Sequence, residues 1–569
     1  MFAQAVLIAA ILYGVLEGWH RDFRVPLWFY GDSLVLEMQS KSTIDNGWWW
    51  SNPMLSAPFT FDALAFPANS NVDQAIVSIA GRLVAYPLAA VNVAWMIMVV
   101  FSGLTATWCM RRVGVSGPSA MVAGTLFAVS PYALYRNIDH FNLVIYLVPF
   151  PCAVALQLAA GQSPGRWYWK GWGGLLAGCV LLGFNYAYYP FFGCFFIGVA
   201  AVTGFVLRGS TRVLAAGAVW ILLLTTCTGL NLLPSVYSWS RHGEPVIVAQ
   251  KGRSESEVFG LKIRHLVSPV LNHVFPPLAR LAELEAAVKY PLENENATSR
   301  LGLVGTLGFL GLLGVVFVPS LAGRLERGDT LLAASQLTIA AVLLATIGGF
   351  GTLFNALISP EIRAYNRVCP FIEFFSLTAV ALALDALCAR SGRGRAAALI
   401  AVLVLGVLDQ SQAAEPMNAR HASVAADIPP LRTFVGQLED VLPDRAMVFQ
   451  LPFKVYLNDA GSLGMGPYDH LRLYLVSRRI HWSYPALSNE QVRWQQTLQA
   501  LDGAGLLHRL AADGFAALVV DRYGYSDNGD SMTATIGAIL GDHSVIAESD
   551  RYVAFDVRSL ASAGPRRSG

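Results

Sequence analysis

The chain has 569 residues, of which 54% are hydrophobic and only 14% are charged. This composition is typical of a polytopic membrane protein rather than of a soluble domain. The formal net charge is only +2, and with no basic tract in the sequence this argues against nucleic acid as a partner.

Apolar runs long enough to cross a bilayer recur along residues 1–412. A transmembrane helix needs about 20 mostly apolar residues to span the hydrocarbon core. By this criterion the sequence predicts about eleven transmembrane helices, near residues 2–18, 84–108, 116–134, 142–160, 171–188, 190–207, 213–233, 301–319, 331–348, 369–388 and 396–412.

Basic residues mark one side of these predicted helices. They gather in five short connections that fall on the same side: Arg111 and Arg112, Arg166 and Lys170, Arg208 and Arg212, Arg324 and Arg327, and Arg390, Arg393 and Arg395. The positive-inside rule makes that side cytoplasmic. The opposite side, the periplasm or exterior of a bacterial cell, then holds the loops 19–76 and 234–300 and everything from residue 413 onward.

The loop at residues 19–76 is polar, aromatic-rich and carries six aspartates and glutamates. Loops longer than about 15 residues are uncommon and usually functional. Asp32 follows Gly31 directly after the apolar run VPLWFY, so we expect its carboxylate close to the membrane face. There it can act as a general base on a hydroxyl or hold a divalent cation. The alternative is a capping residue for a helix that begins at this point.

The other acids of this loop are interpreted mainly as turn residues. Asp45 precedes an Asn-Gly turn signal, and it is also a candidate for positioning an acceptor or a metal. Asp62 and Asp73 fit turns or caps. The three tryptophans at 48–50 are interpreted as membrane-interface anchors, with a sugar-binding platform as the alternative.

Two further polar clusters lie on the predicted external side. Asp139 and His140 occupy a short turn between two predicted helices, where they can contact a metal or an acceptor or simply satisfy the helix ends. Arg363, Asn366 and Arg367 precede the run 369–388, against the positive-inside preference. An anion such as a phosphate would compensate for the two arginines.

Salt bridges offer the alternative for the arginine cluster, with Glu361 and Glu373 as the nearby acids in the sequence.

From about residue 413 the chain changes to an ordinary soluble α/β composition. Segments 446–452 and 515–522 predict buried strands, 489–514 predicts two helices with a glycine break, and 544–558 predicts a closing hairpin. At some 150 residues the segment 413–569 is long enough to bury a core of its own.

The order of these motifs resembles the bacterial GT-C superfamily of integral-membrane glycosyltransferases. The resemblance rests on the GDS motif opening the first external loop, on IDHFNLVIYLVPF and IRAYNRVCPFIEFFSL, and on the terminal external α/β domain with FQLPF, YDHLRLYL and HWSYPAL. The first loop lacks the paired Asp-x-Asp or Glu-x-Asp of that pattern, which leaves Asp32 as its main candidate.

The resemblance implies a fold and a reaction. The expected fold is a polytopic α-helical membrane domain over residues 1–412 with a soluble α/β domain over 413–569. The implied donor is a polyprenyl-phosphate sugar and the acceptor is a cell-envelope glycan or lipid. Asp32 would be the general base of an inverting transfer, Arg363, Asn366 and Arg367 would bind the donor phosphate, and Asp139 and His140 would position the acceptor or a divalent cation such as Mg²⁺ or Mn²⁺, whose presence is left open.

A transporter or flippase of lipids or glycolipids is the first alternative function, and an inactive assembly or scaffold protein whose external C-terminal segment binds a partner is the second. Transporters tend to show paired repeats with broken helices in matching positions. We find no such repeat, and few acids within the predicted spans are suited to ion coupling.

Overall fold

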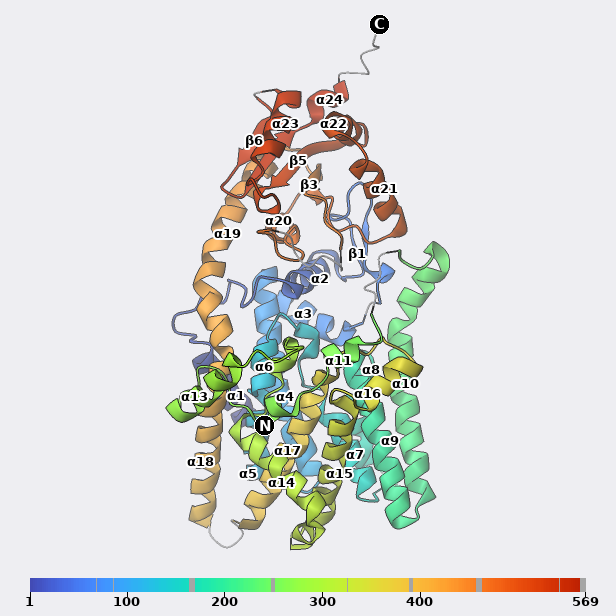
Figure 1. Cartoon of the computed structure of the whole chain (residues 1–569), viewed down its shortest axis with the longest axis vertical. Coiled ribbons are helices and arrows are strands. Elements are labelled where there is room, and N and C mark those ends of the chain that lie inside the picture. The colour runs from blue at the N-terminus through green and yellow to red at the C-terminus, as the bar shows by residue number, and fades with distance from the viewer. Residues whose placement is uncertain are drawn as a thin grey trace.

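The computed structural model describes residues 1–67, 69–84, 86–162, 169–246, 251–324, 326–387, 392–456, 463–541 and 543–562. Arg166 and Arg390, two of the basic residues used to predict sidedness, lie outside the described residues. Figure 1 shows the chain as an elongated molecule with a helical bundle at one end and the C-terminal sheet at the other.

Apolar helices form the bundle. They are α1 (Phe2–Val15), α4 (Pro87–Arg112), α5 (Gly117–Ala128), α7 (Pro149–Ala159), α8 (Trp169–Gly183), α9 (Tyr188–Arg208), α10 (Thr211–His242), α14 (Gly302–Phe317), α15 (Gly328–Ala345), α17 (Cys369–Leu387) and α18 (Gly392–Gln410). Each predicted apolar run overlaps one of these helices. In the described ranges, six helices are long and apolar enough to cross a membrane and four apolar helices are shorter, so the count of eleven stays a prediction.

Small residues allow close packing in the bundle. A Cβ added at Gly103 of α4 would lie 2.9 Å from the carbonyl oxygen of Gly124 in α5, and one added at Gly124 would lie 2.7 Å from that of Gly103. Helices in membranes gain little from hydrophobic exclusion of water, so such close backbone contact supplies much of the packing energy.

The basic connections lie at the end of the bundle that is far from the sheet. The α9–α10 and α14–α15 connections, the latter containing η4 (Pro319–Arg324), are both at the bottom of Figure 1. The turns at Gly114 and Gly161 are at the same end, because a Cβ on either glycine would lie within 2.6 Å of an arginine Nε, that of Arg327 or Arg208 respectively.

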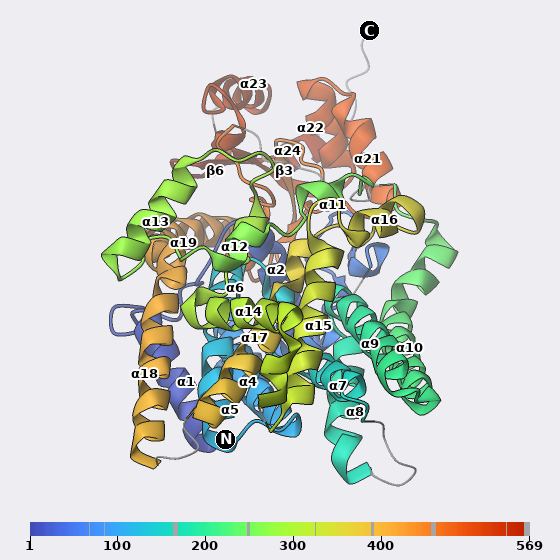
Figure 2. The same ribbon diagram turned by 60° about the horizontal axis from the view of Figure 1, so that its bottom comes forward.

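A middle layer separates the bundle from the sheet. The first loop supplies α2 (Asp32–Asn46), β1 (Ser51–Asn52), β2 (Phe61–Asp62), η1 (Ala63–Ala65) and α3 (Asn71–Val84). Short elements between the bundle helices complete it: α6 (Pro131–Arg136), η2 (Phe141–Leu143), α11 (Glu255–Val258), α12 (Ile263–Val267), α13 (Pro276–Ala287), η3 (Glu295–Thr298), α16 (Phe350–Leu357) and η5 (Tyr365–Val368). Figure 2 shows α11, α12, α13 and α16 lying across the end of the bundle that faces the C-terminal helices.

The C-terminal part begins with a long helix, α19 (Glu415–Val441), which follows α18 through η6 (Ser411–Ala414). Five strands then form a sheet in the order β4 (His481–Trp482), β3 (Met447–Leu451), β5 (Phe515–Asp521), β7 (Tyr552–Asp556) and β6 (Val545–Glu548). The first three are parallel, and β7 runs antiparallel to both β5 and β6. The helices are α20 (Leu471–Val476), α21 (Asn489–Gln499), α22 (Gly503–Ala512), α23 (Asp530–Leu540) and α24 (Arg558–Ser562), with η7 (Arg522–Gly524).

These elements confirm the two predicted strands, the hairpin and the glycine-broken helix pair to within a few residues. The sequence did not predict α19 as a helix, and it did not predict β4. The domain boundary between residues 412 and 413 stays a prediction.

The first loop and the C-terminal part share one core. Leu55 bridges to Trp482 in parallel, so the loop adds one more extended segment beside β4. The Ala57 N–H donates to the Trp482 carbonyl at 2.9 Å, and the Trp482 N–H donates to Met54 at 3.0 Å. Phe29, Leu34 and Phe61 of the loop are buried in one cluster with Phe434 and Tyr474. The loop that carries Asp32 is therefore held by the C-terminal part.

Candidate active site

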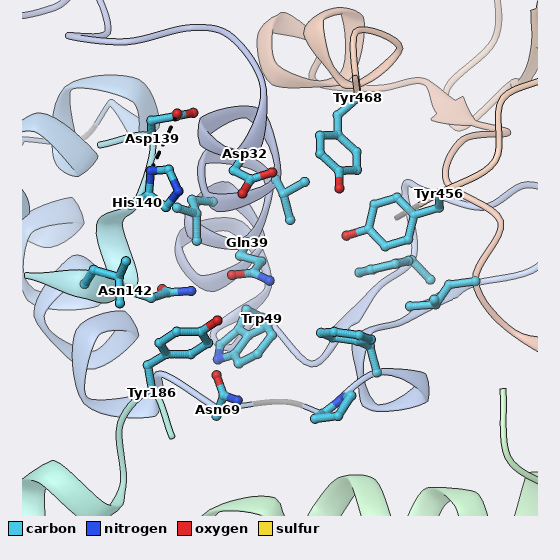
Figure 3. A pocket seen from close by; sticks show the side chains of 18 of the residues that line it. Asp32, Gln39, Trp49, Asn69, Asp139, His140, Asn142, Tyr186, Tyr456 and Tyr468 are labelled. Carbon is cyan, nitrogen blue, oxygen red and sulfur yellow. Dashed lines mark ion pairs between the residues drawn. The ribbon is translucent and has the colours of Figure 1, made fainter. Parts of the chain in front are cut away.

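A pocket of about 210 Å³ lies where the first loop, the turn after α6 and the C-terminal part meet (Figure 3). Its lining is Asp32, Val35, Leu36, Gln39, Trp49, Phe61, Ala63, Phe66, Pro67, Asn69, Asp139, His140, Asn142, Leu143, Tyr186, Arg367, Tyr456, Tyr468 and Leu487. Four residues singled out from the sequence, Asp32, Asp139, His140 and Arg367, thus come together although they span more than 300 positions.

Asp32 is the first residue of α2, and its side chain is exposed. Gly31 precedes it as the capping residue with a φ of 60°, a conformation that glycine adopts without steric cost. No side-chain hydrogen bond caps this helix, so Asp32 marks the predicted helix start without acting as its cap. Within the part of the chain that the structure describes, no hydrogen bond or ion pair occupies the Asp32 carboxylate, which leaves it open to a substrate.

Asp139 approaches Asp32 from the turn after α6. A Cβ added at Gly31 would lie 3.4 Å from Asp139 Oδ1. Burial raises the pKa of the Asp139 carboxyl, and the charge of Asp32 adds to the rise, while His140 and a hydrogen bond from the Ser33 N–H oppose it. The two carboxylates therefore repel each other across the edge of the pocket.

His140 links this acidic edge to a buried ionic cluster. Its Nδ1 is 3.7 Å from Asp139 Oδ2, and its Nε2 is 3.2 Å from Glu295 Oε2. In Figure 3 the Asp139–His140 contact lies on one side of Asp32 and Tyr468 on the other. Asp139 and His140 both line the pocket, and Asp139 also accepts from the Ser33 N–H at the start of α2, so both interpretations of this turn stay predictions.

Arg367 is fixed by three groups. Its Nη1 donates to the Tyr186 hydroxyl at 3.2 Å, its Nη2 lies 3.3 Å from Glu295 Oε2, and its guanidinium covers the ring of Tyr188 at 4.6 Å. Glu295 also accepts from buried Arg136 at 2.7 Å. Burial alone would raise the pKa of Glu295, but Arg136 and Arg367 hold it well below its usual range.

Arg363 and Asn366 do not line the pocket. The Arg363 guanidinium forms an ion pair with Glu255 and covers the Phe259 ring at 5.1 Å. Asn366 is fully buried and accepts a hydrogen bond from Arg136 at 2.7 Å. The salt-bridge partners suggested by the sequence are wrong, since Glu361 pairs with Lys251 and Glu373 lies buried in α17.

Three other loop residues have roles that the sequence did not predict. Asp45 forms an ion pair with Lys41 and lines a different pocket. Trp49 is buried and lines the first pocket, so the expectation of a membrane-interface anchor is wrong for it. Asp73 is no cap: it is buried and accepts hydrogen bonds from the Tyr146 hydroxyl at 2.7 Å and Asn185 at 2.9 Å. Asp62 does cap η1, as expected.

Sequence reasoning also missed Glu295, Tyr186, Tyr456 and Tyr468. The only available signal for Glu295 was an acid shortly before an apolar run, on the same predicted side as the arginines. Tyr456 and Tyr468 come from the C-terminal part and point into the pocket opposite His140 (Figure 3). Nothing local to their sequence shows that they reach residues some 400 positions away.

No protein-family profile matches the sequence, and no curated protein matches it. Among solved structures, ArnT from Cupriavidus metallidurans bound to undecaprenyl phosphate aligns with a TM-score of 0.53 at 13% identity, over 99% of each chain. The chain therefore has the fold of ArnT.

Two further solved structures align at 14% identity over 92% of this chain. They are the Archaeoglobus fulgidus oligosaccharyltransferase, with a TM-score of 0.45 over 69% of its length, and the mycobacterial arabinofuranosyltransferase AftD, with 0.47 over 35%. Both scores lie below 0.5, so neither alignment carries an argument about this chain.

The donor set of this pocket suits a shared cation. No three His, Cys, Asp or Glu side chains in the described ranges are placed to hold a metal by themselves. Asp32 and Asp139, however, are two adjacent carboxylates. Mg²⁺ is usually held by one or two carboxylates together with waters and substrate phosphates, so this pair fits an ion completed by a substrate.

Proposed function

We propose that the chain is a membrane glycosyltransferase. It would move a sugar from a polyprenyl-phosphate donor to a glycan or lipid acceptor of the cell envelope. The observation that carries the proposal is the pocket itself, which sets the unoccupied Asp32 carboxylate and the Arg367 guanidinium around one space. The similarity to ArnT, a structure bound to undecaprenyl phosphate, supports the class of donor.

The chain would act at the external face of a bacterial inner membrane. The proposal takes eleven transmembrane helices over residues 1–412 and a periplasmic or extracellular α/β domain over 413–569. The positive-inside rule supports this orientation. Nucleotide sugars are absent outside the cytoplasm, so a donor used there has to be presented on a lipid.

Each step can be assigned to a residue of the chain. The acceptor hydroxyl gives its proton to Asp32, and the resulting oxygen attacks the anomeric carbon from the face opposite the phosphate. The bond between that carbon and the phosphate oxygen breaks, and its electron pair leaves on the polyprenyl phosphate. Arg367 stabilises the charge that develops there. A single displacement of this kind inverts the anomeric centre.

Of the residues suggested by the sequence, we assign roles in the transfer to those that line the pocket or hold its arginine cluster. Arg367 reaches the pocket, so it is assigned the donor phosphate. Asn366 is assigned to positioning, because it holds Arg136 in the cluster around Glu295. Arg363 and Asp45 lie outside the pocket and receive no role in the transfer. Asp139 and His140 keep the proposed role of positioning the acceptor.

A divalent cation would fit beside the same residues. Asp32 and Asp139 would hold Mg²⁺ or Mn²⁺ together with a substrate phosphate, and the ion would neutralise charge on that phosphate. The Tyr456 and Tyr468 hydroxyls and the Trp49 ring face the remaining space, where a sugar ring can be enclosed.

Replacing Asp32 with Asn tests the proposal. We expect turnover to fall by about 10²–10⁴-fold, the usual contribution of a general base, while binding of the polyprenyl-phosphate donor is retained. Asp22→Asn is the matched control, because Asp22 is an exposed acid of the same loop whose carboxylate accepts from the Arg24 N–H at 2.9 Å. A transporter or flippase would keep its activity in both variants, and that result would overturn the proposal.

A further inference from the structure

A second pocket, of about 860 Å³, lies behind helix α2. It is lined by Lys41, Asp45, Asn46, Asn52, Met54, Tyr86, Pro87, Arg432, Tyr474, Leu475, Val476, Ser477, Arg478 and Ile480. These residues come from the first loop, the start of α4, α19, and α20 with the segment that follows it. The pocket shares no lining residue with the first one.

The two pockets lie on opposite faces of α2. Lys41 follows Asp32 by nine residues, which is roughly two and a half helical turns and therefore half a turn out of phase. Asp32, Leu36 and Gln39 line the first pocket, whereas Lys41 and Asp45 line the second. An α-helix thus forms the wall between them.

The second pocket carries an excess of positive charge. Its lining holds three cationic side chains, Lys41, Arg432 and Arg478, against a single acid, Asp45. Lys41 is buried and forms an ion pair with Asp45, and its ammonium covers the Tyr474 ring at 5.1 Å. The two arginines remain, and in the described part of the chain no carboxylate forms an ion pair with either of them.

The side chain of Arg432 is held by a neutral group, and the backbone of Arg478 is held by the Glu439 carboxylate. The Arg432 guanidinium donates to the Tyr86 hydroxyl and covers its ring at 5.3 Å. Arg478 follows Ser477, whose hydroxyl donates to Glu439 Oε1 at 3.0 Å, and its own N–H donates to the same oxygen at 2.6 Å. The backbone of Arg478 is therefore fixed while its charged side chain stays exposed.

The amide of Asn52, which also lines the pocket, already has hydrogen-bond partners within the chain. Asn52 donates to Ser42 Oγ and to the Tyr474 hydroxyl, both at 2.6 Å, and its Oδ1 accepts from the Met54 N–H at 2.9 Å. The two arginines are therefore the lining groups that a ligand would pair. Guanidinium groups bind phosphate through two parallel hydrogen bonds.

We propose that this second pocket binds a phosphate group, carried either by a lipid headgroup or by a soluble molecule. Arg432 and Arg478 would contact the phosphate, and Lys41 would add charge beside them. The inference concerns binding only, so it stands or falls independently of the glycosyl transfer proposed for the first pocket.

The double variant Arg432→Gln/Arg478→Gln tests it in the detergent-solubilised full chain. Inorganic phosphate, compared with chloride at equal ionic strength, should raise the unfolding temperature of the native chain in a saturable way. We expect the variant to bind phosphate roughly tenfold more weakly or worse, since hydrogen bonds to charged groups are strong. The control Arg493→Gln/Arg509→Gln removes the same charge from exposed positions on α21 and α22 and should behave as native.

Native mass spectrometry with phosphatidylglycerol and phosphatidylcholine separates the two sources. Phosphatidylglycerol adducts that vanish only in the double variant would identify a lipid headgroup. A phosphate effect lost in that variant without lipid adducts would identify a soluble ligand. If phosphate acts equally on the native chain, the variant and the control, or shows no saturable effect while lipid adducts are also unchanged, the inference is wrong.

Discussion

The two faces of helix α2 differ in which charges are already neutralised. On the first face, Arg367 is held by Glu295, while the Asp32 carboxylate has no hydrogen-bond or ion-pair partner among the described residues. On the second, Asp45 is held by Lys41 while Arg432 and Arg478 face the pocket without a carboxylate partner among the described residues. A free acid suits proton removal or a cation, and free guanidinium groups suit an anion. Helix α2 thus separates a pocket with an available carboxylate from a pocket with available guanidinium groups.

Glu295→Gln should produce the largest effect on stability. The variant leaves the buried charges of Arg136 and Arg367 uncompensated, and breaking a buried pair in this way typically costs about 3–5 kcal/mol. The loss of the Glu295 charge would also leave the arginines beside the first pocket without a carboxylate partner. The two faces of α2 would then no longer differ in this respect. Thermal unfolding in detergent measures the loss.

Glu293→Gln is the control for this prediction. Glu293 is more exposed than Glu295; it pairs with Arg264 and also contacts the buried His265 at 2.8 Å, so a smaller loss of stability than for Glu295→Gln is expected. Equal stability of both variants would show that Glu295 does not hold the arginines of the first pocket.

The free energy of unfolding should depend on pH through Asp73, and Asp73→Asn should remove that dependence. Burial raises the pKa of Asp73 to about 7, against hydrogen bonds from Tyr146 and Asn185 that lower it. Because the folded state holds this proton more tightly than the unfolded chain, the stabilisation is complete below a pH of about 4 and is lost as the pH rises through about 7.

We expect a contribution of roughly 2–4 kcal/mol across that window. Unfolding temperatures between pH 4 and 8 should fall more steeply for the native chain than for Asp73→Asn, whose amide oxygen can still accept from Tyr146. If the unfolding temperatures of the native chain and of Asp73→Asn change with pH in parallel, the raised pKa of Asp73 is contradicted.

Asp45→Asn should have the smallest effect of these variants. It tests whether the two faces of α2 act separately. Freeing Lys41 from an ion pair that is partly exposed to solvent should tighten phosphate binding in the second pocket by about two- to threefold. Turnover should stay native, because Asp45 lies on the face of α2 away from Asp32. A loss of turnover comparable to that of Asp32→Asn would return Asp45 to the acceptor-positioning role that the sequence suggested.

Local patterns explain what could be predicted from the sequence. Apolar runs located the bundle helices, and alternating or β-branched stretches located β3, β5 and the β6–β7 hairpin. The positive-inside rule predicted that Asp32, Asp139 and Arg367 lie on the same side of the membrane. Each of these inferences uses residues that are near in sequence or a rule about which side of a membrane they occupy.

Long-range contacts explain what could not be predicted. Arg363 and Arg367 are four positions apart, yet one pairs with Glu255 outside the pocket and the other with Glu295 beside it. The bridge from Leu55 to Trp482 joins two segments that have no common local signal. Such pairings depend on how distant elements pack, so the shared core and the second pocket appear only in the structure.

A structure of the chain with bound polyprenyl phosphate tests the central claim most directly. We expect the lipid phosphate within hydrogen-bond distance of Arg367, with the Asp32 carboxylate facing the space where an acceptor hydroxyl meets the anomeric carbon. A polyprenyl phosphate bound away from the first pocket, with Arg367 engaged only by Glu295, Tyr186 and Tyr188, would contradict it.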